Sequence, residues 1–178
     1  GPVEESMILQ KYGANKILSF NDVELEQLNN IQLSELIINI FSENNGKILI
    51  LSNTNKGKTI TPQIAYKTKA SLIANAISKP ENYSPIQIKC KAFSSKASVL
   101  YESLSEKTII SLLPNSIGIQ EKPVTATLQN CSKEIRNDEK IIINKREKNS
   151  NQISLNDADI VISGGRGLKG PENWNMIE

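Results

Sequence analysis

The feature that most constrains the fold is an alternation of short apolar runs with longer segments of helical period. Apolar runs of strand length occupy residues 16–20 and 47–51, and apolar residues recur at helical spacing in residues 3–12 and 33–41. A third helix is predicted to begin near Pro62, because proline fits the first turn of a helix. Strands separated by helices pair in parallel through right-handed crossovers. The pattern therefore predicts an α/β domain with an open, doubly wound sheet.

Further along the chain the apolar segments become shorter and lose their helical spacers. Additional strands are predicted at residues 86–93, 97–101, 107–113, 124–128, 140–144 and 158–163. The first three of these lack helices between them, so we expect them to be antiparallel additions to the sheet. A polar connector is expected over residues 144–156. With 178 residues, the chain has room for one domain of ordinary size.

The chain contains no histidine and two cysteines, Cys90 and Cys131. Histidine is the most frequent general base, so Ser-His-Asp and Cys-His catalysis cannot be built from these residues. The two cysteines lie far apart and lack CxxC spacing, so they form neither a zinc knuckle nor a thioredoxin motif. We therefore expect two buried free thiols and no metal site.

Charge and hydropathy argue against two classes of partner. Lysine and arginine number 21 and aspartate and glutamate 19, without a long run of either sign, which is not the basic footprint of a nucleic-acid-binding protein. The longest apolar run, at residues 47–51, is far shorter than the ~20 residues of a membrane helix, and no leader opens the chain. We expect a soluble, cytoplasmic protein with no nucleic-acid partner and no membrane insertion.

One loop imitates a phosphate-binding motif. Residues 52–59 follow a predicted strand and end in Gly-Lys-Thr, as a Walker A loop does. The Walker A loop also needs glycine at its first position, where this chain has Ser52, and a magnesium-binding aspartate after a later strand, which is missing. We interpret the segment as a plain strand-to-helix loop, with a P-loop nucleoside triphosphatase as the alternative.

A second loop carries more chemistry. Gly164, Gly165 and Gly167 surround Arg166 directly after the last predicted strand. Glycines let backbone N–H groups converge on an anion, and a guanidinium can bind a phosphate bidentately. These four residues therefore predict a phosphate or flavin-pyrophosphate site. The alternative is a tight turn in which Arg166 pairs with a nearby carboxylate such as Glu172.

Residues 158–174 read Ala-Asp-Ile-Val-Ile-Ser-Gly-Gly-Arg-Gly-Leu-Lys-Gly-Pro-Glu-Asn-Trp. This segment resembles the signature that closes the N-terminal domain of the electron transfer flavoprotein alpha subunit. Residues 12–18 are similar to that family's Gly-Ala-x-Lys-Val segment, and residues 57–65 resemble its Gly-Lys/Arg…Pro-x-x-Ala helix start. The chain departs from the family at Gln63, where arginine is frequent, and at residues 111–113, which replace a Thr-Val-Arg strand.

The resemblance implies a three-layer, Rossmann-like α/β domain similar to the adenine nucleotide alpha hydrolases. Residues 1–157 would form the N-terminal domain of an electron transfer flavoprotein alpha chain. Residues 158–178 would form its last strand, the Gly-Gly-Arg-Gly loop and the start of a helix that leads to an FAD domain. The resemblance also implies that the chain is a fragment lacking that C-terminal FAD domain.

The same resemblance implies a heterodimeric electron carrier rather than an enzyme. Such proteins accept electrons from acyl-CoA or other dehydrogenases and pass them to a quinone oxidoreductase. The alpha subunit holds FAD, and the beta subunit, its partner, holds AMP. The family's flavin-contacting arginine matches Arg166, and Gly164, Gly165 and Gly167 would let the cofactor approach the backbone. We expect Trp174 to be a packing residue rather than a redox relay.

Two other functions remain open at this point. A stand-alone nucleotide- or flavin-binding domain would keep the fold without transferring electrons. A phosphate-transferring enzyme could use Lys58 and Arg166, although the lack of histidine and of a carboxylate cluster for a metal argues against it.

Overall fold

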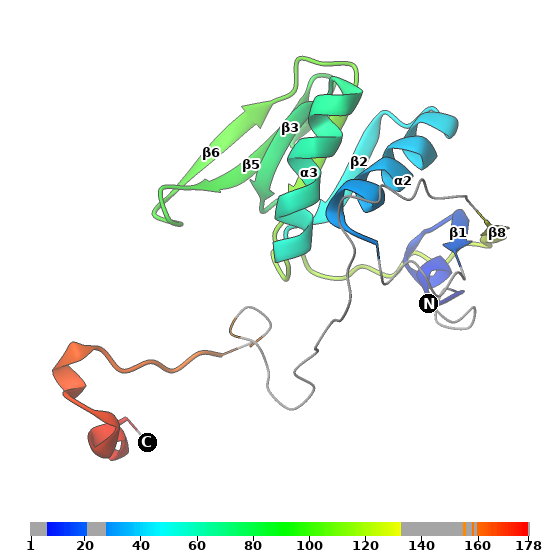
Figure 1. The fold of residues 1–178 in the computed structure, drawn as a ribbon. Helices are drawn as coiled ribbons and strands as arrows, with labels where there is room; N and C mark the ends of the chain where they lie inside the picture. Colours follow the sequence, from blue (N-terminus) through cyan, green and yellow to red (C-terminus); the bar gives the residue numbers. More distant parts are fainter. Residues whose placement is uncertain (1–6, 21–27, 133–154, 156–157, 159, 178) are drawn as a thin grey trace. The chain divides into compact units, whose positions relative to one another are not determined.

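The computed structural model describes residues 7–20, 28–132, 155, 158 and 160–177. The chain divides into two compact units, Gly1–Ile143 and Asn144–Glu178, and each is described by itself. The elements of the first unit, shown in Figure 1, are the 3-10 helix η1 (Ile8–Tyr12), β1 (Lys16–Phe20), α2 (Asn30–Glu43), β2 (Ile48–Ser52), α3 (Asn55–Thr68), β3 (Ser71–Ala76), β4 (Asn82–Tyr83), β5 (Ile86–Ala92), β6 (Ala97–Glu102), β7 (Thr108–Leu112) and β8 (Thr127–Cys131).

The main sheet combines a parallel half with an antiparallel half. Its strand order is β2-β7-β3-β5-β4, and β6 is attached to β5. β7 pairs in parallel with both β2 and β3, whereas β5 pairs antiparallel with β3, β4 and β6. A separate two-stranded parallel sheet joins β1 to β8. The predicted α/β class, with parallel pairing and antiparallel additions, is confirmed.

The α-helices α2 and α3 cover the same face of the main sheet. Ile60 and Ile64 of α3 pack against Ile109 of β7, and the partly buried Leu33 and Ile37 of α2 join this cluster. Burial of such aliphatic side chains is the main favourable term that holds helices on a sheet. The parallel half of the sheet is thereby fixed under α2 and α3.

The opposite face of the sheet carries a second apolar cluster, to which neighbouring strands of the same sheet contribute. Ile110 of β7 and Ile73 of β3 pack with Ile88 and Cys90 of β5, and each of these four side chains is at most 4% exposed. This second core therefore extends from the parallel strands β7 and β3 to the antiparallel strand β5. A helical third layer, which the resemblance implies, is not found among the residues that the structure describes.

The prediction for residues 107–113 was wrong in one respect. This segment is β7, but it is the parallel strand between β2 and β3, not an antiparallel addition. Its residues Thr108 to Ser111 are all buried, as is typical of a central parallel strand. The chain passes from β3 to β7 through the antiparallel strands β4 to β6, so no helix marks the crossover. The strand β3 was not predicted from the sequence.

The predicted start of the third helix was also wrong. α3 begins at Asn55, where Thr54 is the N-cap and its Oγ1 accepts a hydrogen bond of 3.2 Å from the Gly57 N–H. A threonine cap satisfies one of the free N–H groups of the first turn. Pro62 therefore lies inside α3 and is exposed.

α2 begins three residues earlier than the periodicity of residues 33–41 indicates, because of a capping box. Asn29 Oδ1 accepts from the N–H groups of Ile31 at 3.0 Å and Gln32 at 2.9 Å. The Gln32 side chain accepts in return from the Asn29 N–H at 3.0 Å. This reciprocal pair satisfies the first turn of the helix.

The remaining predicted segments had mixed outcomes. Within residues 3–12 the described part forms η1, which ends as expected at Gly13 with a left-handed φ of 97°. The strand expected at residues 124–128 is β8, displaced toward the C-terminus. The strand expected at residues 140–144 lies outside the described residues. Residues 158 and 160–163 adopt no strand, because the described residues of their unit offer no neighbouring strand for a ladder.

Candidate functional site

The Gly-Gly-Arg-Gly loop lies in the second unit, between two short 3-10 helices. Gly165 is the N-cap of η3 (Arg166–Leu168), and η4 (Pro171–Met176) follows after Gly170. The Leu168 N–H donates to the Gly165 carbonyl at 3.0 Å, and the Lys169 N–H donates to the Arg166 carbonyl at 3.1 Å. Residues 165–169 are therefore held in one tight turn, and Gly164 directly precedes it.

The three predicted glycines differ in their surroundings. A methyl group at Gly164 would lie 2.7 Å from Leu168 Cδ2, 3.2 Å from Ile177 Cδ1 and 3.3 Å from Trp174 Cζ3. At Gly165 and Gly167, in contrast, no described atom lies within 4 Å of an added methyl group. Gly164 has a packing requirement of its own, whereas Gly165 and Gly167 leave open backbone on both sides of Arg166.

Arg166 is exposed, and among the described residues it forms no ion pair. The alternative pairing of Arg166 with Glu172 is therefore not found in this structure. Instead, the Glu172 carboxylate lies close to Gly170. An exposed guanidinium without a carboxylate partner keeps its planar set of donors available for an anionic ligand.

The Trp174 side chain packs against the start of the loop, at Gly164. It lies in η4, is 39% exposed, and approaches Gly164 together with Leu168 and Ile177. The Asn173 side chain adds a hydrogen bond of 2.9 Å to the Leu168 carbonyl. These contacts agree with the expectation that Trp174 packs the loop.

A second polar cluster, which the sequence did not reveal, lies in the first unit at the carboxyl ends of β2, β3 and β7. Asn53 is buried, and its Nδ2 donates to Asn75 Oδ1 at 2.8 Å while its Oδ1 accepts from Ser111 Oγ at 2.7 Å. Ligands of parallel α/β sheets bind at this edge. Here the polar atoms are bonded to one another, so the cluster joins the three strand ends.

The loop that imitates a Walker A motif belongs to the same edge. Gly57 lies in the first turn of α3 against the Ser52 carbonyl, where no side chain would fit. Lys58 is exposed, and the Thr59 hydroxyl donates to the Asn55 carbonyl at 3.0 Å. Residues 55–59 already belong to α3, so only Asn53 and Thr54 connect β2 to the helix. The geometry supports the prediction of a plain strand-to-helix connection.

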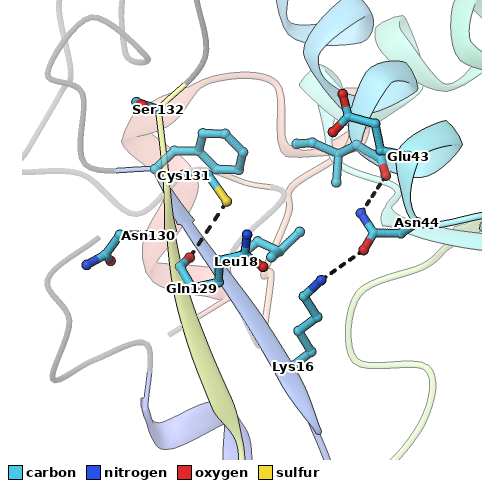
Figure 2. A pocket seen from close by; sticks show the side chains of 10 residues that line it. Lys16, Leu18, Glu43, Asn44, Gln129, Asn130, Cys131 and Ser132 are labelled. Carbon is cyan, nitrogen blue, oxygen red and sulfur yellow. Dashed lines mark hydrogen bonds between the residues drawn. The ribbon is translucent and has the colours of Figure 1, made fainter.

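A hollow of about 470 Å³ lies between the β1–β8 sheet and the C-terminal end of α2 (Figure 2). Lys16 Nζ donates to Asn44 Oδ1 at 3.1 Å, and Asn44 Nδ2 donates to the Ile40 carbonyl at 2.8 Å. Cys131 Sγ lies 3.7 Å from the Gln129 carbonyl oxygen. No motif in the sequence predicts this hollow. Lys16 and Asn44 are thus bonded to each other, and Asn44 is also bonded to the backbone of α2.

The two cysteines are free thiols in different environments. Cys90 is completely buried in the core, as predicted, and burial raises the pKa of its thiol above the ordinary value. Cys131 is half-buried, so the prediction of a buried thiol was wrong for this residue, which lies in the two-stranded sheet of β1 and β8. In the described part of the chain, no three potential ligands from histidine, cysteine, aspartate and glutamate come together around a metal position. None of the described helices combines the length and apolar character that crossing a membrane requires.

Comparison with known proteins assigns the class of protein. The family model of the electron transfer flavoprotein domain matches residues 1–138. The chain therefore belongs to the electron transfer flavoprotein domain family, in agreement with its α/β fold.

Among curated proteins, the chain is similar to the electron transfer flavoprotein subunit alpha of Bacillus subtilis (strain 168). The two are 23% identical over 169 residues, which is 94% of this chain and 52% of the relative. The chain thus spans about half the length of the curated relative that it matches. The similarity confirms the resemblance to the alpha subunit that the short motifs indicated.

Proposed function

We propose that this chain is part of a heterodimeric, FAD-containing electron carrier, in which it serves as an alpha subunit. The observation that carries the proposal is the match to the electron transfer flavoprotein domain over residues 1–138, together with similarity to an alpha subunit over 94% of the chain. The partner is a beta subunit of the same family, which holds AMP. Electrons arrive from acyl-CoA or other dehydrogenases and leave to a quinone oxidoreductase or a similar acceptor.

The Gly-Gly-Arg-Gly loop fits a role in holding FAD. Arg166 is exposed and lacks an ion-pair partner in the described residues, and the open positions at Gly165 and Gly167 allow a ligand close to the backbone. When FAD is bound, it supplies the redox chemistry of the carrier. Arg166 then contributes positive charge and directed hydrogen bonds, and Gly164 keeps the loop seated on Trp174.

The two segments predicted from the sequence, residues 1–157 and 158–178, have separate tasks in this proposal. Residues 158–178 would provide the loop that contacts FAD, and residues 1–157 the α/β scaffold that docks the beta subunit. The scaffold carries the larger apolar cores of the described residues, whereas the loop unit is held by Gly164, Leu168, Trp174 and Ile177. Substitutions in the loop should therefore alter FAD binding without unfolding the scaffold.

The test is substitution of Arg166 in the full gene product that contains this chain, coexpressed with its beta partner. Loss of a charge-assisted hydrogen bond, worth roughly 1.5 to 3 kcal/mol, predicts that Arg166→Ala weakens FAD binding about ten- to hundredfold. Arg166→Lys should also weaken FAD binding, by a large part of the loss seen with alanine. Lysine keeps the positive charge but lacks the planar guanidinium that can form two parallel hydrogen bonds. FAD titration by flavin fluorescence measures both effects.

A neighbouring charge provides the matched control. Lys169 lies next to η3 with a φ of 65°, a conformation that glycine adopts freely. Lys169→Gly removes one positive charge from the same loop, and we expect it to change FAD affinity much less than Arg166→Ala does. Unchanged FAD binding in Arg166→Ala, accompanied by lower thermal stability, would show that the arginine serves the turn and not the cofactor.

A further inference from the structure

The connection from α2 to β2 contains the dipeptide Asn45-Gly46, which is the only Asn-Gly pair in the sequence. The side-chain amide of an asparagine can be attacked by the backbone nitrogen of the following residue. The approach is easiest before glycine, which has no side chain to hinder it. Asparagine is accordingly one of the thermolabile residues of proteins. The sequence therefore places a chemically reactive pair between the helix and the strand.

The structure holds this pair in a Schellman turn at the end of α2. Asn45 lies in the left-handed region, with a φ of 48°. The Gly46 N–H donates to the Phe41 carbonyl at 2.8 Å, and the Asn45 N–H donates to the Ser42 carbonyl at 3.0 Å. These two hydrogen bonds are the pattern that defines the motif. The nitrogen that would attack Asn45 is thus bound to the helix.

The two reacting groups lie in different environments. Asn45 is exposed, so water reaches its side-chain amide. Gly46 is half-buried, and it lies against the Phe41 ring so closely that no side chain would fit. The Phe41 side chain is itself buried, and Lys107 Nζ lies 5.9 Å from the centroid of its ring. The ring and the carbonyl of Phe41 together restrain the Gly46 nitrogen.

We propose that Asn45 is a site of spontaneous deamidation and that opening of the Schellman turn sets its rate. When the turn opens, the Gly46 nitrogen attacks Asn45 Cγ and gives up its proton to the departing amide. The new C–N bond forms as the Cγ–Nδ2 bond breaks, and ammonia leaves. Water then hydrolyses the cyclic imide at either carbonyl, which gives aspartate or isoaspartate. Water is the only co-reactant.

The products should weaken the junction between α2 and the sheet. Both place a carboxylate at the C-terminal end of α2, where the helix dipole is already negative. Isoaspartate also adds a carbon atom to the backbone between residues 45 and 46, which disturbs the spacing of the Schellman hydrogen bonds. The next residue, Lys47, accepts a hydrogen bond of 2.8 Å at its carbonyl from the Thr108 N–H of β7. The strain would therefore reach the start of the parallel ladder.

The experiment follows the deamidated fraction of Asn45 over time, in buffer and in urea above the unfolding transition. Peptide mass spectrometry identifies the site, and isoelectric focusing detects the added negative charge. We expect Asn45 to react at least about tenfold faster in urea, because the folded chain reacts only while the turn is open. Folded chain that has been aged should also unfold at a lower urea concentration than fresh chain. The test needs neither FAD nor a beta subunit, so it is independent of the proposed function.

Asn115 provides an internal control, and Asn45→Gly a control for the site. Asn115 is also exposed and left-handed, with a φ of 57°, but it precedes Ser116. In urea it should react more slowly than Asn45, because the serine side chain hinders the attack. Asn45→Gly removes the amide and keeps a turn that glycine favours. It should abolish the acidic product of this site while preserving the circular-dichroism spectrum.

Asn44→Ala tests whether the turn sets the rate. Asn44 Nδ2 donates to the Ile40 carbonyl at 2.8 Å, and Asn44 Oδ1 accepts from Lys16 Nζ at 3.1 Å. Alanine removes both bonds and so loosens the end of α2, while the reactive pair itself is unchanged. We expect severalfold faster deamidation of Asn45 in the folded variant and an unchanged rate in urea.

Several outcomes would overturn the proposal. They are a lack of deamidation at Asn45 in urea, faster reaction of Asn115 than of Asn45 there, and equal rates for Asn45 in the folded and unfolded chain. A folded Asn44→Ala variant that reacts no faster than the parent chain would also do so, because the turn would then not control the reaction.

Discussion

At the scale of single residues, two glycines of this chain illustrate why position matters more than residue type. Gly57 lies in the first turn of α3 so close to the Ser52 carbonyl that an added methyl group would collide with backbone. Gly118, in contrast, has no described atom within 4 Å of such a methyl group. The tight passage from β2 into α3 therefore requires glycine at position 57, whereas nothing in the described structure requires glycine at position 118.

The first prediction concerns this pair. Gly57→Ala should lower the free energy of unfolding by about 2 to 4 kcal/mol, because the backbone at Ser52 must move; this exceeds the ~1 kcal/mol that alanine gains in helix propensity. Gly118→Ala, its control, should change stability by less than about 0.5 kcal/mol. Urea denaturation measures both. Equal effects of the two substitutions would contradict the close approach seen at Gly57.

At the scale of elements, α3 is a helix that contains an internal proline. Pro62 lies within Asn55–Thr68 and is exposed. Its missing N–H leaves the Lys58 carbonyl without the usual helical donor, and its ring crowds the preceding turn. α3 is held in place despite this by Ile60, Ile64 and Ala65, which are buried against the sheet. Tertiary packing therefore overrides the local preference of proline.

The second prediction follows from that conflict. Pro62→Ala should raise the free energy of unfolding by about 1 to 2 kcal/mol, because the helical hydrogen bond returns, while the greater freedom of the unfolded chain offsets part of the gain. Lys58→Ala, at another exposed position of α3, should alter stability by less than about 0.5 kcal/mol. A loss of stability in Pro62→Ala, measured by urea titration, would mean that the proline shapes α3 in a way that packing needs.

At the scale of the whole molecule, the proposed FAD site is incomplete within the residues described. The Gly-Gly-Arg-Gly loop is exposed at Arg166, and a cofactor site normally encloses most of its ligand. A single exposed loop supplies one wall, so tight binding requires further protein surface from the rest of the carrier.

The third prediction is therefore that the 178-residue chain, purified by itself, is colourless. We expect no stoichiometric flavin in its visible absorption spectrum, because the loop alone cannot shield the cofactor. The full gene product assembled with a beta subunit serves as the comparison and should be yellow. Stoichiometric FAD in the isolated chain would show that these residues already form a closed site.

The sequence by itself determined those features that depend on neighbouring residues. The apolar runs of β1 and β2, the periodicity of α2 and the alternation of β5 and β6 indicate their elements directly. Short motifs in the segments around Gly13, Gly57 and Arg166 were sufficient to recognise the family, which the comparison over residues 1–138 confirms. The chemistry expected of Arg166 likewise rests on residue types and their order.

Contacts between distant segments decided the rest, because such contacts leave no periodic trace in the sequence. β7 lies between β2 and β3 although the intervening strands β4 to β6 extend the sheet beyond β3, and no local pattern distinguishes the position of β7 from an edge. The hydrogen bonds of Asn53 with Asn75 and Ser111 join three strand ends that are far apart in the chain.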